Sequence, residues 1–239
     1  MKLVKPSVEI LYCDPYFLNL IEQAGRTCYK SEDKITKDSY KVFIKNLLRR
    51  GHESPIEFGV LVVKFITDRG ILAEITRHRL ASFAVESTRY VDYNKKGIEI
   101  IVPFWYSNIW NNIDKINEGL RTGWDISEIG ISCGLTEEEK DFLKGLQTAE
   151  KLYSKLVGVY RQKPEQARAV LPHCLKTEIV MGANFREWRH IFRLRMNRKA
   201  HLQMQEIMVE LYNKLRLTYP EIFDIMFKDV NSKGGYYEL

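Results

Sequence analysis

The chain has 239 residues, of which 45% are hydrophobic and 12% aromatic, and its formal net charge is +6. This composition excludes a disordered chain and fits a single domain over residues 1–239 with one sizeable core. The sequence has no run of about twenty apolar residues, so we expect no membrane span. Acidic residues and a proline interrupt the N-terminal segment, so we expect no signal peptide and a cytoplasmic location. The basic excess is mild, and it fits binding of phosphorylated small molecules as well as nucleic acid.

The first part of the chain predicts strands and helices without a regular repeat. A strand is predicted over 8–14, followed by a helix that ends near Cys28. A second helix is predicted over 36–50, with Gly51 as its C-terminal cap. The β-branched and aromatic run over 60–66 then predicts a buried strand.

The middle of the chain is harder to assign. Asp68 is expected to cap a helix over 70–80, which a loop follows. Another strand is predicted over 98–102. Residues 104–135 are polar and aromatic without a clear period, so we expect an irregular excursion there.

The last part of the chain predicts mostly helices. Thr136 and Glu139 form the pattern of a capping box, which opens a long helix to about Arg161. The further elements are a short helix from Pro164, an extended segment over 175–181, and helices over 184–217 with a break near 196–200. Because strands and helices do not alternate as βαβ units, we predict an α+β fold, with a mixed or antiparallel sheet packed with long helices.

The cysteines and histidines do not follow a metal-binding or disulfide pattern. The cysteines stand at positions 13, 28, 133 and 174, and no two of them form a CxxC pair. The five histidines show no HExxH pattern. We therefore predict no metal site and no disulfide framework.

A first basic cluster lies between residues 77 and 90. It contains Arg77, His78, Arg79 and Arg89, with serine and threonine hydroxyls between them. A helix C-terminus favours one or two nearby cations, but it does not explain Arg89, which lies beyond the loop. Arginines with hydroxyls in a turn are typical of a phosphate site. Arg168, just before a Leu-Pro helix stop, is a further candidate.

A second basic cluster lies on the helix that begins near Asn184. On a helical wheel, one polar side holds Arg186, Arg189, His190 and Arg193. Arg195 is the exception, because it falls on the apolar side. A guanidinium cannot lose its charge, and leaving it buried and unpaired costs several kcal/mol, on the order of the desolvation penalty per ion. Arg195 therefore requires either an internal carboxylate or a bound anion.

Together these segments resemble the flavin-dependent thymidylate synthases over roughly residues 8–215. The similar segments are Arg77-His78-Arg79 followed by seven residues and Ser87, HESPIEF over 52–58, STRY over 87–90, ARAVLP over 167–172, Asn184-x-Arg186 with the later Arg195, and AHLQMQEIM over 200–208. The resemblance implies reductive methylation of dUMP to dTMP. It also implies 5,10-methylenetetrahydrofolate as one-carbon donor, reduced FAD as hydride donor, NADPH as reductant of the flavin, and a homotetramer with shared active sites.

The resemblance also implies roles for individual residues. The expected FAD contacts are Ser54, Arg77, His78, Arg79, Asn184, Arg186 and His190. The expected dUMP contacts are Glu74, Arg77, Glu86, Ser87, Thr88, Arg89, Arg168 and Arg195. Arg195 is the expected catalytic residue, because it contacts the uracil and favours its ionisation.

The sequence departs from the family at a few positions. Ala84 and Val85 stand where many members have Asn-Glu, so side-chain contacts are lost there. Glu74 replaces a glutamine of some members, and a carboxylate beside a nucleotide needs a partner or a proton. His190 replaces an asparagine of some members, which keeps a polar group.

Three other functions compete with this interpretation. A nucleic-acid-binding module fits the basic excess, but here the arginines gather in two short motifs and do not follow one broad stripe. A scaffold protein would carry no flavin. A cysteine-dependent thymidylate synthase would use Cys174 as nucleophile, although a buried cysteine is more often a small apolar residue. We therefore expect dUMP as substrate and no nucleic-acid or membrane partner.

Three polar residues of the motifs have a structural alternative. We expect Ser87 to donate or accept hydrogen bonds, because no His-Asp pair is placed to activate it as a nucleophile. His52 and His201 fit a structural role as well as a functional one.

Overall fold

The computed structural model of the protein describes residues 1–231. The strands are β1 (Lys2–Val4), β2 (Ser7–Tyr12), β3 (Val60–Asp68), β4 (Ala81–Val85), β5 (Glu99–Ile101) and β6 (Lys176–Asn184). The α-helices are α1 (Phe17–Thr27), α2 (Tyr40–Arg49), α3 (Arg69–Ile75), α4 (Tyr93–Lys96), α5 (Ser107–Asn111), α6 (Ile113–Thr122), α7 (Ile126–Cys133), α8 (Glu137–Gly158), α9 (Pro164–Ala167), α10 (Phe185–Arg195), α11 (Leu202–Thr218) and α12 (Pro220–Asn231). Short 3₁₀ turns are η1 (Glu32–Lys34), η2 (Ser54–Phe58) and η3 (Arg168–Val170). This content confirms the predicted α+β class.

The chain forms two compact units, and each is assembled from separate segments of the sequence. The first unit contains Met1–Ser7, Ile66–Ile75 and Val85–Ile179. The second unit contains Val8–Phe65, Thr76–Ala84 and the chain from Val180 onwards.

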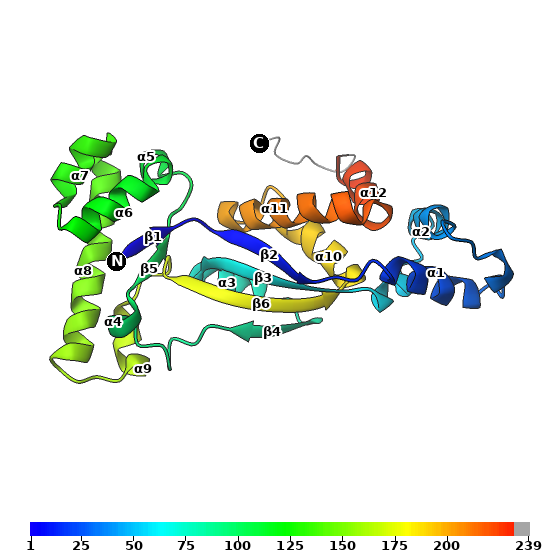
Figure 1. The fold of residues 1–239 in the computed structure, drawn as a ribbon, viewed down its shortest axis with the longest axis horizontal. Coiled ribbons are helices and arrows are strands. Elements are labelled where there is room, and N and C mark those ends of the chain that lie inside the picture. Colours follow the sequence, from blue (N-terminus) through cyan, green and yellow to red (C-terminus); the bar gives the residue numbers. More distant parts are fainter. Residues whose placement is uncertain (232–239) are drawn as a thin grey trace. The chain divides into compact units, whose positions relative to one another are not determined.

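Two sheets are present among the described residues. In the smaller sheet, β1 and β5 run parallel, with Leu3 opposite Ile100. The larger sheet has the order β2-β3-β6-β4, so β6 lies between β3 and β4 (Figure 1). Phe185, after β6, donates its amide proton to the carbonyl of Gly59, which precedes β3, so β3 and β6 are antiparallel. The predicted mixed or antiparallel sheet is confirmed.

The two central strands of the larger sheet are formed by alternating apolar side chains. In β3, the side chains of Leu61, Val63 and Phe65 are fully buried. In the second unit, helix α10 packs on this face, because the Trp188 ring lies 6.3 Å from the Phe65 ring and its Nε1 donates to the carbonyl of Leu61. The β-branched and aromatic run that predicted a buried strand over 60–66 therefore contributes one face that is covered by helix.

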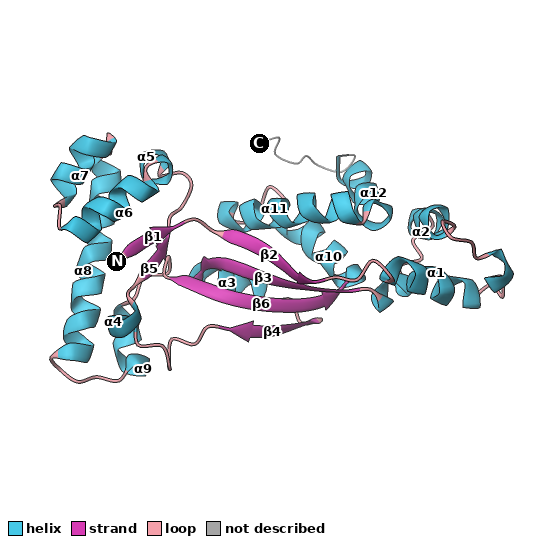
Figure 2. Cartoon of the chain, viewed as in Figure 1, coloured by secondary structure: helices cyan, strands magenta, loops and turns pink. Residues whose placement is uncertain are grey.

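Residues 104–135 form helices, so the predicted irregular excursion is wrong. Figure 2 shows α6, α7 and α8 beside one another in the first unit. Helix α6 ends at Gly123, whose φ of +88° is unfavourable for other residues, and Gly134 with φ +65° ends α7 in the same way. Asp125 and Glu128 form a full capping box at the start of α7. These start and stop signals are present in the sequence, but the scattered aromatic residues hide the helical period.

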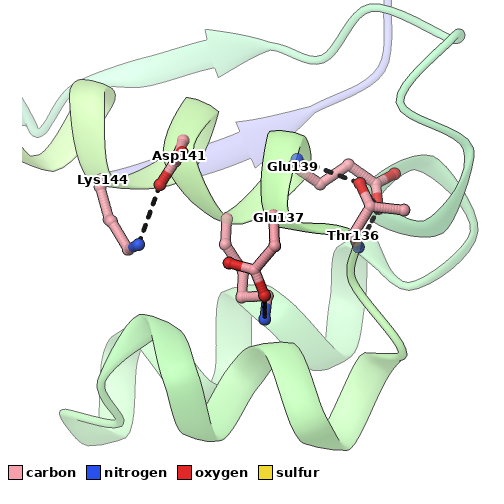
Figure 3. Close-up of polar contacts among 6 residues, drawn as sticks. Thr136, Glu137, Glu139, Asp141 and Lys144 are labelled. Carbon is pink, nitrogen blue, oxygen red and sulfur yellow. Dashed lines mark hydrogen bonds and ion pairs between the residues drawn. The ribbon is translucent and has the colours of Figure 1, made fainter.

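The capping box predicted at the start of α8 is confirmed (Figure 3). The Thr136 hydroxyl accepts from the amide of Glu139 at 3.2 Å, and the Glu139 carboxylate accepts from the amide of Thr136 at 2.9 Å. The same carboxylate accepts from the amide of Asn108 at 2.9 Å, which fixes α5 on α8. The pKa of Glu139 is lowered, because these hydrogen bonds outweigh the opposing effect of burial.

Several boundaries differ from the prediction. The helix capped by Asp68 ends at Ile75, not at residue 80, although the cap is confirmed by a 2.8 Å hydrogen bond from the amide of Ile71. The expected loop after it contains β4, whose short and half-exposed sequence gives no strand signal of its own. Helix α2 begins at Tyr40, and β1 and α12 were not predicted.

The remaining predicted elements are confirmed within a few residues. They are the strands β2, β5 and β6, the helices α1, α8 and α9 with η3, and the helical segment that breaks between α10 and α11. Among the helices of residues 1–231, none is both long enough and apolar enough to cross a membrane.

Candidate active site

The side chain of His78 lies at the centre of a polar cluster in the second unit. It is 5% exposed, whereas its neighbours Arg77 and Arg79 are exposed in the turns after α3. Its Nε2 accepts from Arg195 Nε at 2.9 Å, and its Nδ1 lies 3.6 Å from a carboxylate oxygen of Glu187. Because Nε2 accepts a hydrogen bond, the neutral ring carries its proton on Nδ1.

The electrostatics around His78 keep its ring neutral. Burial, then the positive charge of Arg195, and then the nearby His190 together lower the pKa of His78 to about 4. The two imidazole rings lie 6.3 Å apart, with His190 exposed on α10. The structure therefore brings together three residues that the resemblance assigned to the site: His78 from the turn after α3, His190 from the middle of α10 and Arg195 from its C-terminal end.

Arg195 is half-buried, as the helical wheel predicted. Its Nε donates to the neutral ring of His78, and this hydrogen bond orients the guanidinium. Of the two alternatives left open by the sequence, a bound anion stays a prediction.

We expect His78 to stay neutral across the physiological pH range. Its folded-state pKa lies below the ordinary value of 6.5, so the neutral ring stabilises the fold above pH 6.5, and this contribution is lost as the pH falls toward 4. NMR titration of the His78 ring should give a pKa near 4 in the wild-type protein and a higher value in Arg195→Ala. Arg193→Ala, which removes the same charge from the same helix, is the matched control. A wild-type pKa near 6.5 would contradict the geometry.

The structure corrects the position of Arg189. The helical wheel placed it on the solvated side of α10, but its side chain is only 1% exposed. Its Nε and Nη2 donate to one carboxylate oxygen of Glu53 at 3.2 and 3.1 Å, and its Nη1 donates to the carbonyl of Ile222. Arg193 donates to the same oxygen of Glu53 at 3.0 Å. The wheel failed because it describes only the helix and not the carboxylate that lies beside it.

Two residues expected to contact the flavin line one pocket. Ser54 at the start of η2 and Asn184 at the end of β6 both border a pocket of about 430 Å³ in the second unit. Its other lining residues are Ala24, Cys28, Pro55, Glu57 and Phe58. Asn184 also caps α10, because its Oδ1 accepts from the amide of Glu187 at 2.9 Å. A serine hydroxyl and an amide from distant segments therefore meet at one cavity.

Arg186 is joined to this pocket by an ion pair with Glu57, one of its lining residues. Its Nη1 donates to the carboxylate of Glu57 at 2.5 Å, and Glu57 lines the pocket. The ion pair is about half-exposed on both sides, so a stronger anion can compete with the carboxylate for the guanidinium at modest cost.

A second group of expected site residues lies in the first unit, in the segment we call the nucleotide loop (residues 86–89). The Thr88 side chain is buried, and its hydroxyl accepts from Arg168 Nη1 at 2.9 Å, although the two residues are 80 positions apart. The Ser87 hydroxyl accepts from the amide of Arg89 at 3.3 Å, and Arg89 Nε lies 3.7 Å from the Glu165 carboxylate. The hydroxyls of this turn thereby lie beside two guanidinium groups, that of Arg89 within the turn and that of Arg168 from η3, which is the chemistry of a phosphate site.

The remaining residues singled out in the sequence lie outside the two clusters and the pocket described above. Glu74 is half-buried on α3, and Ala84 lies exposed in β4. His52 is exposed, with its Nδ1 2.9 Å from the hydroxyl of Tyr29. His201 accepts from the amide of Gln203 at 3.3 Å at the start of α11, which gives it a capping role.

Three groups near Arg195 are of the kind that ligate metals. His78, Glu187 and His190 each place a donor atom within 4.8 Å of the others. Arg195 already donates to Nε2 of His78, and its charge opposes a second cation at that ring. We assign no metal to this cluster.

Cys174 is half-buried before β6, and its thiol is poorly suited to nucleophilic attack. Burial raises the pKa of the Cys174 thiol to about 12. Since the thiolate is the nucleophile, almost none of the reactive form is present near neutral pH.

The resemblance implies dTMP formation, and replacement of Cys174 by alanine is therefore expected to leave the rate of that reaction within about threefold of wild type, the scale of a side chain outside the chemistry. Purified variant and wild-type protein are compared at saturating substrates. A loss of about a thousandfold, the scale for removing a covalent nucleophile, would restore the cysteine-dependent mechanism.

The comparisons with known proteins agree with the motifs. Residues 11–221 match the family described as thymidylate synthase complementing protein. Over 227 residues, the chain is 28% identical to the probable flavin-dependent thymidylate synthase of Mycobacterium phage D29, with 90% of this chain and 86% of the phage protein covered. Over 210 residues, it is 29% identical to the flavin-dependent thymidylate synthase of Corynebacterium glutamicum, with 85% of this chain and 77% of that protein covered.

A similar fold occurs in a solved structure. The crystal structure of thymidylate synthase X from Helicobacter pylori with FAD and dUMP matches with a TM-score of 0.67 at 23% identity. The match covers 93% of this chain and 99% of the H. pylori chain. At this identity the likeness shows that the two proteins share a fold.

Proposed function

Because this chain belongs to the thymidylate synthase complementing protein family, we propose that it methylates dUMP to dTMP as a flavin-dependent thymidylate synthase. The observation that carries the proposal is the pocket of the second unit, where Ser54 and Asn184 meet from segments 130 positions apart. Both were expected to contact FAD from their motifs alone. Relatives with flavin-dependent thymidylate synthase activity in their names, in a phage and in C. glutamicum, support the same function.

The pocket fits part of a dinucleotide cofactor. Its volume of about 430 Å³ lies in the usual range of ligand sites, about 300–1,000 Å³. Ser54 offers a hydroxyl and Asn184 an amide, and Arg186 provides a cation that can exchange Glu57 for a pyrophosphate. We propose that these residues, with Arg77, His78, Arg79 and His190, hold FAD. Bound FAD, reduced by NADPH, supplies a hydride, and 5,10-methylenetetrahydrofolate supplies the one-carbon unit.

The nucleotide loop is proposed to bind dUMP. Ser87, Arg89 and Arg168 offer a hydroxyl and two guanidinium groups to the phosphate, and the buried Thr88 fixes Arg168 by accepting its hydrogen bond. Glu74, Glu86 and Arg77 complete the expected contacts. This arrangement explains why a mildly basic protein concentrates its arginines in short motifs.

Arg195 is proposed to act on the uracil ring. Methylation at C5 requires electron density at that carbon, and a cation beside the ring stabilises the negative charge that ionisation at N3 produces. The neutral His78 orients Arg195 through Nε and adds no second positive charge of its own. A preorganised guanidinium is effective because it needs little rearrangement when the charge develops.

The proposals for the co-substrates, the oligomeric state and the cellular location rest on the family resemblance. We propose NADPH and 5,10-methylenetetrahydrofolate as co-substrates, a homotetramer with shared active sites, and a cytoplasmic location. We propose no nucleic-acid partner, because the candidate basic residues gather around two local sites.

Equilibrium dialysis with FAD and FMN tests the flavin site. We expect FAD to bind and FMN to bind at least about tenfold more weakly, because the adenylate half is lost. Arg186→Ala should weaken FAD binding about tenfold, the effect of losing one charged hydrogen bond. Arg121→Ala is the control, because it breaks an exposed arginine–glutamate pair on α6 instead. Equal binding of both flavins, or of neither, would contradict the assignment.

A further inference from the structure

We propose that Tyr93 is a positioning residue that holds Glu86, and with it the nucleotide loop, in the conformation that binds dUMP. The proposal rests on the dUMP site proposed above and adds a residue that contacts no expected ligand. Tyr93 begins helix α4, directly after the motif that carries Ser87 and Arg89.

The contact that motivates the proposal joins two side chains of the first unit. The hydroxyl of Tyr93 donates to Oε1 of Glu86 at 2.9 Å, with the Tyr93 side chain buried and Glu86 half-buried. A hydrogen bond to a carboxylate in such surroundings is stronger than one between neutral groups. Burial of the hydroxyl, and then its contact with Glu86, raise the pKa of Tyr93, so the hydroxyl keeps its proton and remains a donor.

The backbone of Glu86 is fixed at both ends. Its amide donates to the carbonyl of Glu178 at 2.9 Å, which continues the pairing of β4 with β6. Its carbonyl accepts from Arg69 Nη1 at 3.0 Å, and the same nitrogen donates to the hydroxyl of Thr177, also at 3.0 Å. With its main chain held in this way, only the side chain of Glu86 can still rotate, and the hydrogen bond from the Tyr93 hydroxyl restricts where its carboxylate lies.

Tyr93 is itself held by helix α8 and by the hydrophobic core of the first unit. Its ring belongs to the hydrophobic core of the first unit and lies 6.1 Å from the ring of Tyr153 on α8. The amide of Tyr93 donates to the Tyr153 hydroxyl at 3.3 Å. Ala167, next to the candidate phosphate ligand Arg168, belongs to the same core. The hydrophobic core that α6, α7 and α8 help to form therefore supports both the nucleotide loop and the segment that carries Arg168.

A purely structural role for Tyr93 is the competing explanation. A buried tyrosine contributes to stability through its ring, and Tyr93→Phe keeps the ring and removes only the hydroxyl. A structural role predicts a lower unfolding temperature and unchanged binding of dUMP. A positioning role predicts weaker binding of dUMP that depends on Glu86.

A double-mutant cycle on dUMP binding separates these explanations. Isothermal titration calorimetry measures the Kd for dUMP in the FAD-loaded wild type, in Tyr93→Phe, in Glu86→Ala and in the double variant. We expect Tyr93→Phe to raise this Kd about tenfold, the loss of one hydrogen bond to a charged group. In the Glu86→Ala background, Tyr93→Phe should raise it no further, because the hydroxyl acts only through that carboxylate.

The matched control is Tyr106→Phe, which removes a hydroxyl from a tyrosine packed against the same core. It should leave the Kd for dUMP unchanged, and FAD binding should stay within about twofold in every variant, which is within ordinary variation of such measurements. Additive effects of Tyr93→Phe and Glu86→Ala, or wild-type affinity in Tyr93→Phe, would overturn the inference. A wild-type protein that does not bind dUMP would instead overturn the proposed function.

Discussion

Replacement of Arg195 by alanine is expected to lower the rate of dTMP formation by a factor of about 100 to 1,000, the effect of removing one preorganised donor from a developing charge. The same change should shift the unfolding temperature of the apoprotein by no more than about 4 °C, because Arg195 is half-buried and its hydrogen bond to the neutral ring of His78 contributes about 1 kcal/mol. Rates at saturating FAD, NADPH and dUMP and thermal unfolding of the apoprotein measure the two effects.

Arg195→Lys distinguishes charge from geometry. Lysine keeps the positive charge but loses the planar fork that donates to His78 and to a ligand at once, so it should restore little activity. Arg198→Lys, a substitution of the same kind just beyond α10, is the control and should keep wild-type activity. If Arg195→Ala unfolds many degrees lower while each folded molecule keeps its activity, Arg195 is a structural residue.

Removal of the Glu53 carboxylate is expected to have the largest effect on stability. Glu53→Ala leaves the guanidinium of Arg189, which is 1% exposed, without its carboxylate partner. Breaking a buried ion pair in this way costs about 3–5 kcal/mol, and we expect about 3 because Glu53 keeps some access to water. Chemical denaturation of the apoprotein gives the free energy of unfolding. Glu57→Ala, which breaks a half-exposed pair on the same turn, should cost less than about 1 kcal/mol.

The Glu53 pair also predicts a dependence on pH. Burial alone would raise the pKa of Glu53, but the hydrogen bond from Arg193 and the charge of Arg189 outweigh it and lower the pKa below the ordinary 4.5. The pair therefore stabilises the fold above pH 4.5, and its contribution is lost as the pH falls through the folded-state pKa. We expect Glu53→Gln to weaken the loss of stability between neutral and acid pH. If the free energy of unfolding of Glu53→Gln falls between neutral and acid pH as much as that of wild type, the Glu53 pair does not cause this fall.

The elements that were predicted correctly are those whose own residues carry a strand or helix-capping signal. The strand β3 follows from its β-branched and aromatic residues, and α8 follows from Thr136 and Glu139, which cap it as the pattern requires. The same capping pattern at Asp125 and Glu128 was present but overlooked, because the surrounding aromatic residues break the apparent period. The helices over 104–135 were therefore predictable in principle.

Other features depend on partners distant in the sequence. Strand β4 exists because its backbone pairs with β6, and its own side chains carry no strong preference for a strand. Arg189 is buried because Glu53 lies 136 positions away in the sequence and 3.1 Å away in space. A helical wheel cannot contain that information.

Sequence motifs predicted the candidate ligand contacts, but not the residues that support them. The motifs named Ser54, Asn184, Thr88 and Arg168, and the structure places the first two at one pocket and the last two in hydrogen-bond contact. The supporting residues lie outside those motifs. Tyr93 is an example, because its proposed role depends on a hydrogen bond from its hydroxyl to Glu86, which sequence patterns do not encode.

The measurement that tests the account most directly is dTMP formation from dUMP by the purified protein, with and without FAD, in the presence of NADPH and 5,10-methylenetetrahydrofolate. We expect dTMP to form only when FAD is present, and Cys174→Ala to behave like wild type. Formation of dTMP without FAD, or no dTMP from a protein that binds both FAD and dUMP, would contradict the proposed function.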